Sequence, residues 1–298
     1  MVYTVAYLGP PSTYSHQATL STFPPDEYDH VPCVQIADIL SSVEQGATDF
    51  GVVPFENSTN GSVVQSLDLF CDREGLFPSV KVRGEVYLDV HHCLLGHPRG
   101  GDGGISRDTV SRIYSHPQAF GQCEKFLTEH LKGVERIDVS STSKAADLAN
   151  KDPSAVAIAS SIAASVHQGL QILAENIEER SDNTTRFLVI SKETVGPSPI
   201  QGSDKTFMTF TVHHEQPGAL CDMLMVFKEF GMNLTSISSR PSLNVAWNYI
   251  FLVEFEGHQD AKHVQKALQK MKKYCRSMRV FGSYESTRGL KRTVESTG

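Results

Sequence analysis

Short apolar runs alternate with helical patterns along roughly the first 190 residues, and this alternation limits the fold more than any other feature. Each run has five or six residues, mostly apolar or β-branched, as expected of strands covered on both faces. Between the runs, apolar residues recur at helical spacing, for example at Ile36, Ile39 and Val43. The pattern predicts βαβ units and a mostly parallel sheet. The predicted strands are Tyr3–Leu8, Phe50–Phe55, Val110–Tyr114, Arg136–Ser140, Ala155–Ala159 and Arg186–Ile190.

The chain changes character at Gly196-Pro197-Ser198-Pro199, a segment that cannot continue a helix and is typical of a linker. A chain of 298 residues also favours two domains over one. The order βαββαβ after the linker predicts a ferredoxin-like module, whose sheet edges and open face we expect to pair with a second copy. Its expected strands are Thr206–Val212, Leu234–Ser238, Tyr249–Phe255 and Met278–Gly282, with helices at Pro217–Phe230 and Asp260–Tyr274.

Composition narrows the class of protein. The 27 basic and 34 acidic side chains give a net charge of −7, which argues against a nucleic-acid partner. No apolar run approaches the length of a membrane span, and the first residues lack the cationic start of a signal peptide. The six cysteines form no CxxC pair, which favours a reducing, cytoplasmic location. The pairs His91-His92 and His213-His214 have no third ligand nearby, so we expect no metal.

Ligands of parallel sheets bind beyond the carboxyl ends of the strands, so the polar stretches there are candidate sites. In the first, Gly9–Ser15, the hydroxyls of Thr13 and Ser15 stand at a helix start, where they either hold an anion or cap the helix. In the second, Pro54–Gly61, capping needs only one of several polar side chains, so Asn57 and Ser58 are candidates for ligand binding.

Two further polar stretches are candidates, of which the first follows a predicted strand and the second leads into one. In Tyr114–Gln122, Ser115, His116 and Gln122 precede or begin a predicted helix, although such a histidine is often only a surface residue. In Asp182–Phe187, Arg186 has the geometry to bind a carboxylate with two hydrogen bonds. The alternative for Arg186 is an ion pair with Glu178 or Glu179.

The four stretches GPPSTYS, PFENSTNG, SHPQAFGQC and NTTRF, in this order, resemble the motif regions of prephenate dehydratase. The later segments QPGAL and SSRP resemble its ACT regulatory domain, and the match spans about residues 3 to 284. The resemblance implies an α/β fold of two subdomains with a cleft between them, as in periplasmic binding proteins, followed by a ferredoxin-like βαββαβ ACT domain. The implied limits are 1–195 for the catalytic domain (second subdomain about 80–170), 196–204 for the linker, 205–285 for the ACT domain and 286–298 for a tail.

The resemblance implies conversion of prephenate to phenylpyruvate, carbon dioxide and water in phenylalanine biosynthesis, without a metal or organic cofactor. It places Thr185 as the donor to the leaving oxygen, with His116 as the titratable alternative and Ser115 as a third catalytic candidate. We expect Asn57, Ser115, Thr185 and Arg186 to face one cavity. The implied substrate-binding residues are Thr13, Ser15, Asn57, Ser58, Gln122, Asn183, Arg186 and Phe187.

The ACT resemblance implies feedback by phenylalanine bound between paired modules, in a homodimer or homotetramer. Two positions depart from the family pattern. Ser12 stands where a glycine is usual, which is tolerated if the backbone there does not need a positive φ. Ser238 stands where a glutamate is usual. The implied phenylalanine-binding residues are Pro217, Gly218, Ala219, Leu220, Asn233, Leu234, Ser239 and Arg240.

Three other functions compete with this interpretation. An arogenate dehydratase would perform the same elimination on the transaminated substrate, and the motifs barely separate the two. A non-catalytic amino-acid sensor would combine a binding cleft with an ACT module, but it has no need of a donor such as Thr185. A pyridine-nucleotide dehydrogenase would need a G-x-G-x-x-G turn after its first strand, which this sequence lacks.

Overall fold

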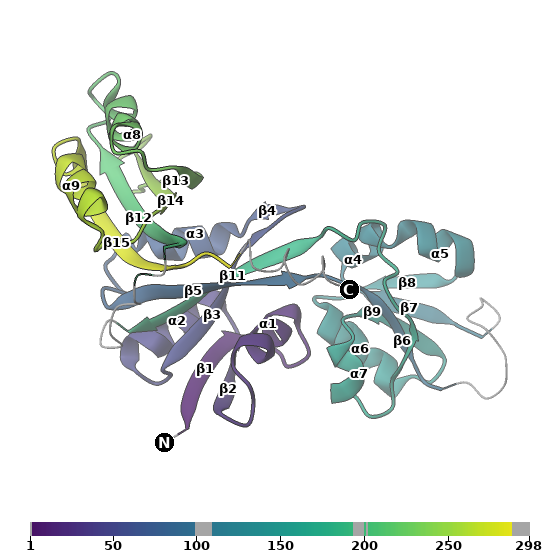
Figure 1. Ribbon diagram of the computed structural model, residues 1–298. Helices are drawn as coiled ribbons and strands as arrows, with labels where there is room; N and C mark the ends of the chain where they lie inside the picture. Colours follow the sequence, from purple (N-terminus) through teal and green to yellow (C-terminus); the bar gives the residue numbers. More distant parts are fainter. Residues whose placement is uncertain (1, 99–108, 193–199, 201, 288–298) are drawn as a thin grey trace.

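The computed structural model describes residues 2–98, 109–192, 200 and 202–287. These residues form three sheets, two in the catalytic part and one in the C-terminal module (Figure 1). The predicted linker segment Gly196–Pro199 and most of the predicted tail lie outside the described residues. Within the described ranges, no helix is both long and apolar enough to cross a membrane.

The first subdomain is built on a sheet of order β2-β1-β3-β11-β5, with the short β4 paired to β3. β1 runs parallel to β2 and β3, whereas β11 runs antiparallel to both β3 and β5. The prediction of a mostly parallel sheet is therefore wrong for this half. The elements are β1 (Tyr3–Leu8), α1 (Tyr14–Thr22), β2 (Tyr28–Cys33), α2 (Ile36–Gln45), β3 (Phe50–Asn57), β4 (Gly61–Ser62), α3 (Val64–Cys71), β5 (Val80–Asp89) and β11 (Thr184–Lys192).

The second subdomain has a sheet of order β10-β6-β9-β7-β8, in which β7 is parallel to β8 and β9 and the other pairs are antiparallel. It begins after β5, later than the predicted residue 80, because β5 belongs to the first sheet. Its elements are β6 (Cys93–Gly96), β7 (Arg112–Ser115), α4 (Pro117–Gln122), α5 (Glu124–His130), β8 (Glu135–Asp138), α6 (Thr142–Lys151), β9 (Ala155–Ala159), α7 (Ile162–Val166) and β10 (Gln171–Ala174).

The C-terminal module has the predicted βαββαβ order, with a sheet of order β13-β14-β12-β15. One face of this sheet forms a core with the two helices of the module, through residues such as Phe210, Met223, Phe255 and Val264. Its elements are β12 (Asp204–Val212), α8 (Ala219–Glu229), β13 (Leu234–Pro241), β14 (Tyr249–Glu256), α9 (Lys262–Met271) and β15 (Cys275–Glu285).

The other face of the C-terminal sheet packs on the catalytic part, on the side where Figure 1 shows α3 and β5. Phe207 and Phe281 of the module join Phe55 and Phe70 of the first subdomain, with ring centroids 5.2 to 5.9 Å apart. The predicted pairing of this open face with a second copy is therefore wrong, because the chain itself covers the face. Pairing of the sheet edges with a second copy stays a prediction.

Candidate functional site

A cavity of about 570 Å³ lies between the two subdomains of the catalytic part. Its wall is formed where β1, β3, β7 and β8 end, which is where ligands of α/β sheets usually bind. Seven of the predicted site residues line it: Thr13, Ser15, Asn57, His116, Gln122, Asn183 and Thr185.

Asn57 organises the donors at the end of β3. Its Oδ1 accepts hydrogen bonds from the backbone N–H groups of Thr59 and Asn60, at 3.0 and 2.9 Å. Its Nδ2 therefore faces the other way and donates to Asn183 Oδ1 at 2.7 Å and to Thr185 Oγ1 at 3.0 Å. Because the Thr185 oxygen accepts from Asn57, the hydroxyl hydrogen of Thr185 is left to donate into the cavity.

Three helices begin at the cavity wall. Thr13 caps α1 by accepting from His16 N at 3.2 Å, His116 caps α4, and Ser141 caps α6 by accepting from Lys144 N at 3.0 Å. The first turns of such helices present unpaired amides and the positive end of the helix dipole. Among the described residues that line the cavity, none is Asp, Glu, Lys or Arg. The cavity therefore suits an anion held by amides and neutral side chains.

The structure does not bring Ser58, Ser115 or Phe187 to this cavity as predicted. Ser115 is fully buried, and its Oγ donates to the carbonyl of Ile158 at 3.0 Å, which ties β7 to β9. Ser58 donates to the carbonyl of Asp182 and accepts from Thr184 N, so it fixes the chain entering β11. Phe187 follows Thr185 by two residues in β11 and is buried in a core that includes Ala18 of α1.

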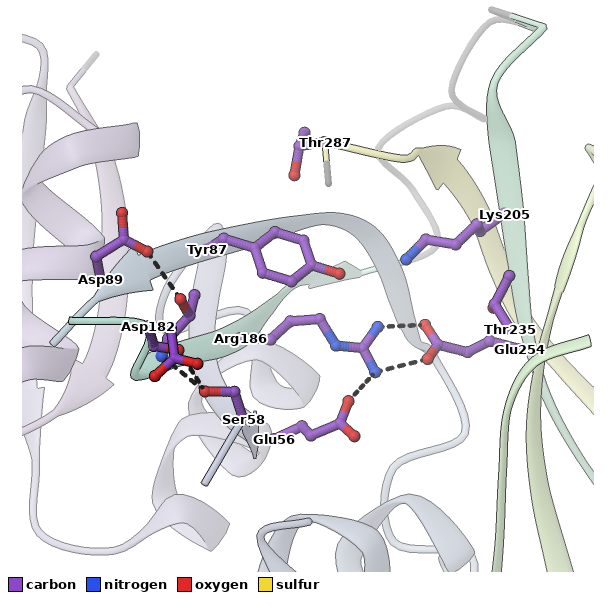
Figure 2. A pocket seen from close by; sticks show the side chains of 11 residues that line it. Glu56, Ser58, Tyr87, Asp89, Asp182, Arg186, Lys205, Thr235, Glu254 and Thr287 are labelled. Atoms are coloured by element: carbon purple, nitrogen blue, oxygen red, sulfur yellow. Dashed lines mark hydrogen bonds and ion pairs between the residues drawn. The ribbon is translucent and has the colours of Figure 1, made fainter. Parts of the chain in front are cut away.

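Arg186 is also not at the cavity, and the predicted contact with a substrate carboxylate is wrong for this structure. Its guanidinium makes two hydrogen bonds to Glu254 of β14, at 2.8 and 2.6 Å, and lies 3.1 Å from Glu56 (Figure 2). The reason is geometric: successive residues of a strand point to opposite faces, so Arg186 points away from the side of Thr185. The alternative pairing with Glu178 or Glu179 is wrong as well, since Glu178 pairs with His91.

Arg186 instead lines a second cavity of about 550 Å³ between the catalytic part and the C-terminal module. Lys205 of β12 contacts Glu85 of β5 at 2.6 Å, and the Tyr284 hydroxyl donates to Glu254. Burial opposes ionisation of Arg186 and Glu254, but their mutual attraction raises the pKa of Arg186 and lowers that of Glu254. This buried cluster of charges therefore joins the two parts of the molecule.

Several residues at the first cavity were not predicted. Ser140, Ser141 and Thr142 line it at the end of the predicted strand Arg136–Ser140, so their hydroxyl run carries the same signal as the other stretches. His92 and Tyr14 line it too, but nothing in the sequence around His92 distinguishes it from an incidental histidine. Both ring nitrogens of His92 have partners, Tyr14 Oη at 2.7 Å and Gln122 Oε1 at 2.6 Å.

The turn before α1 does not meet the condition stated for Ser12, that its backbone needs no positive φ. Ser12 has a φ of +70°, in the left-handed region that favours glycine, so the backbone here does need a positive φ. The Ser12 side chain has partners in the second subdomain, since its Oγ lies 2.7 Å from Ser143 Oγ of α6. Ser160 Oγ also donates to the Ser12 carbonyl at 3.3 Å.

The predicted phenylalanine-binding residues do not converge within one chain. Gly218, with a φ of +85°, caps α8 just beyond the end of β12, next to Pro217, Ala219 and Leu220. Leu234, beside Asn233, pairs with Phe255, and Phe255 pairs with Thr206 near the start of β12. Along β12, Thr206 is about 20 Å from the end of the strand, just beyond which α8 begins. Ser239 and Arg240 lie near the end of β13, and the Arg240 guanidinium makes two hydrogen bonds of 2.9 Å to Asp68 of α3.

Comparison with known proteins gives separate matches for the catalytic part and for the C-terminal module. A family model described as prephenate dehydratase matches residues 5–195, and one described as ACT domain matches residues 206–272. A bifunctional chorismate mutase/prephenate dehydratase of Aquifex aeolicus is 42% identical over 280 residues, which cover 94% of this chain and 73% of the relative. Arogenate dehydratase 2 of Petunia hybrida is 36% identical in an alignment 306 residues long, gaps included, that covers 96% of this chain and 72% of the relative. The crystal structure of a prephenate dehydratase from Arthrobacter aurescens in complex with L-Phe is 28% identical, with a TM-score of 0.83 over 95% of this chain and 90% of that one.

Proposed function

The chain belongs to the prephenate dehydratase family and carries an ACT domain after its catalytic part, and on this premise we propose that it converts prephenate to phenylpyruvate. In this reaction the ring carboxylate leaves as carbon dioxide and its bonding electrons enter the ring. The C4 hydroxyl leaves and, with one added proton, becomes water. The observation that carries the proposal is the cavity between the subdomains, whose described lining has no Asp, Glu, Lys or Arg and in which Asn57 donates to Thr185 Oγ1 at 3.0 Å.

Thr185 is the proposed donor to the departing oxygen. Its Oγ1 already accepts from Asn57 at 3.0 Å, so its own hydrogen is free for the C4 hydroxyl. A threonine is a weak acid, so it acts by hydrogen bonding while the proton itself comes from water. A positioned hydrogen-bond donor to developing charge typically contributes about 10²–10³-fold in rate. Aromatisation of the ring supplies the driving force.

The two carboxylates of prephenate need different surroundings, and the cavity offers both. The amides at the starts of α1 and α6, including that of Thr13, and the hydroxyl of Ser15 are proposed to bind the pyruvyl carboxylate, since the Thr13 hydroxyl itself donates to the Leu8 carbonyl at 3.1 Å. The ring carboxylate must lose its charge as carbon dioxide forms, so a fixed cation beside it would stabilise the ground state and slow the step. The lining residues of the cavity include no Lys or Arg among those described, which fits this requirement.

The same lining favours prephenate over arogenate. The two substrates differ in the side chain, where arogenate has an ammonium group in place of the keto group. An ammonium bound away from water is stabilised by a carboxylate, and no described lining residue of this cavity is Asp or Glu. The amino-acid-sensor alternative gives no reason for the Asn57–Thr185 hydrogen bond, whereas the dehydratase function does.

Steady-state assays of the purified chain with prephenate and with arogenate test the proposal. We expect turnover of prephenate, and we expect Thr185→Ala to lose about 10²-fold or more in kcat while its circular dichroism spectrum is unchanged. Thr185→Ser, which keeps the hydroxyl, is the matched control and should retain much of the activity. Full turnover by a folded Thr185→Ala variant would contradict the role of Thr185, and turnover of arogenate alone would contradict the substrate.

For regulation, we propose phenylalanine as the effector, bound between ACT domains of two copies in a homodimer or homotetramer. The separation between the start of α8 and Leu234 supports this, because one amino acid cannot reach both within one chain, whereas a second copy can supply the missing half. A cytoplasmic location is proposed on the six cysteines, all of which are free thiols.

A further inference from the structure

His92 lies in the segment that crosses from β5 of the first subdomain to β6 of the second, and it is only 2% exposed. It contacts both halves of the catalytic part: Nδ1 lies 2.7 Å from Tyr14 Oη of α1, and Nε2 lies 2.6 Å from Gln122 Oε1 of α4. A buried histidine with both nitrogens engaged has a fixed ring orientation and, once its partners are known, a fixed tautomer. The partners of His92 can be followed back to backbone groups whose polarity cannot change.

The chain of hydrogen bonds starts at Asn57. The amides of Thr59 and Asn60 can only donate, so Asn57 Oδ1 must be the atom that faces them. Asn57 Nδ2 therefore faces Asn183, which must present Oδ1 to it, at 2.7 Å. The orientation of one side-chain amide thus determines that of the next.

Asn183 transmits this orientation to Gln122. With Oδ1 turned to Asn57, Asn183 presents Nδ2 to Gln122 Oε1, at 3.4 Å. The Gln122 oxygen is therefore an acceptor, and the His92 nitrogen 2.6 Å from it must be a donor. Burial lowers the pKa of His92, which favours the neutral ring with a single N–H, at Nε2. Nδ1 is then an acceptor, and the single hydrogen of the Tyr14 hydroxyl is shared between Nδ1 at 2.7 Å and the His91 carbonyl at 3.0 Å.

On the basis of the proposed dehydratase function, we propose that His92 is a positioning residue that acts through Gln122. Its Nε2–H and Asn183 hold the Gln122 oxygen, so the NH₂ group of Gln122 is left to face the cavity that Gln122 lines. An anionic substrate then meets a donor. Without His92, the Gln122 amide can turn and present its oxygen, which repels a carboxylate.

Kinetics of five variants test this inference. We expect His92→Leu to lower kcat/KM for prephenate about tenfold to a hundredfold, the usual effect of one lost hydrogen bond to a charged group. His92→Gln can place an amide donor near the position of Nε2 and should keep most of the activity. The double variant His92→Leu/Gln122→Leu should be no slower than Gln122→Leu alone, because His92 acts only through Gln122. His91→Gln, at the exposed neighbour, is the control and should match the wild type.

The tautomer of His92 is measurable without substrate, by ¹⁵N NMR of the ligand-free protein, with the His92→Gln variant identifying the signals. We expect a neutral ring protonated at Nε2. Protonation at Nδ1, equal losses in His92→Leu and His92→Gln, or multiplicative losses in the double variant would each overturn the inference. Absence of wild-type turnover would instead overturn the proposed function, and the tautomer would still be tested.

Discussion

Thr185 and Arg186 leave β11 on opposite sides of the sheet, so one strand serves two parts of the molecule. Thr185 faces the cavity between the subdomains, while Arg186 reaches Glu254 in the ACT domain. The sequence motif that contains both residues is therefore not a single binding surface. Arg186 is committed to carboxylates of the protein, and the substrate cavity has to hold its anion without a guanidinium.

Substitution of Arg186 separates the two roles. We expect Arg186→Met to lower the free energy of unfolding by about 3–5 kcal/mol, because it leaves the buried carboxylate of Glu254 without its main partner. The double variant Arg186→Met/Glu254→Met removes both charges and should recover part of this loss. Urea unfolding measures the stability, and KM for prephenate is measured alongside. Normal stability of Arg186→Met together with a large rise in KM would contradict this assignment and would show that Arg186 binds the substrate.

At the scale of elements, the sequence predicts strands well where both faces are apolar. Ala155–Ala159, buried at all five positions, is predicted with its observed limits. β5 is absent from the predicted strands because it is no continuous apolar run: Val80, Val82, Val86 and Leu88 alternate with polar residues, the pattern of a strand with one apolar face. Glu85 is only 5% exposed, because it faces Arg186 and Lys205 rather than water. A partner more than 100 residues away gives no local signal, so neither the burial of Glu85 nor the place of Arg186 could be predicted.

The turn that begins α1 allows a test of what the positive φ of Ser12 costs. Ser12 adopts a φ of +70° and contacts Ser143 of the other subdomain. Ser12→Ala keeps the left-handed strain and loses the hydrogen bond, whereas Ser12→Gly loses the bond but relieves the strain. We therefore expect the alanine variant to be about 1–2 kcal/mol less stable than the glycine variant in urea unfolding. Equal stabilities would show that the positive φ carries no cost here.

At the scale of the whole molecule, the ACT domain contacts the catalytic part through packed aromatic side chains as well as through ion pairs. Phe207 and Phe281 pack against Phe55 and Phe70, beside the cluster of Arg186, Glu254 and Lys205. Glu254 contacts Arg186, which directly follows Thr185, so a displacement of the ACT sheet acts one residue from the proposed donor. Regulation by the ACT domain should therefore depend on close packing between the two parts.

Gly282 of β15 is the position where that packing is closest. A Cβ on Gly282 would lie 2.4 Å from the carbonyl oxygen of Val82 in β5, and its φ of +148° already disfavours a side chain. We expect Gly282→Ala to separate the ACT domain from the catalytic part. Scanning calorimetry should then show two transitions, and phenylalanine should lose its effect on turnover.

Gly133→Ala is the matched control for this prediction. Gly133 also has a positive φ, +85°, but a Cβ there meets no atom within 4 Å. The control variant therefore carries a backbone cost at a positive φ without the clash, and it should keep one transition and the full response to phenylalanine. If Gly282→Ala behaves like Gly133→Ala, close contact between β15 and β5 is not what couples the ACT domain to the catalytic cavity. The coupling would then have to run through the Arg186–Glu254 pair. In that case Arg186→Met would be the variant whose turnover no longer responds to phenylalanine.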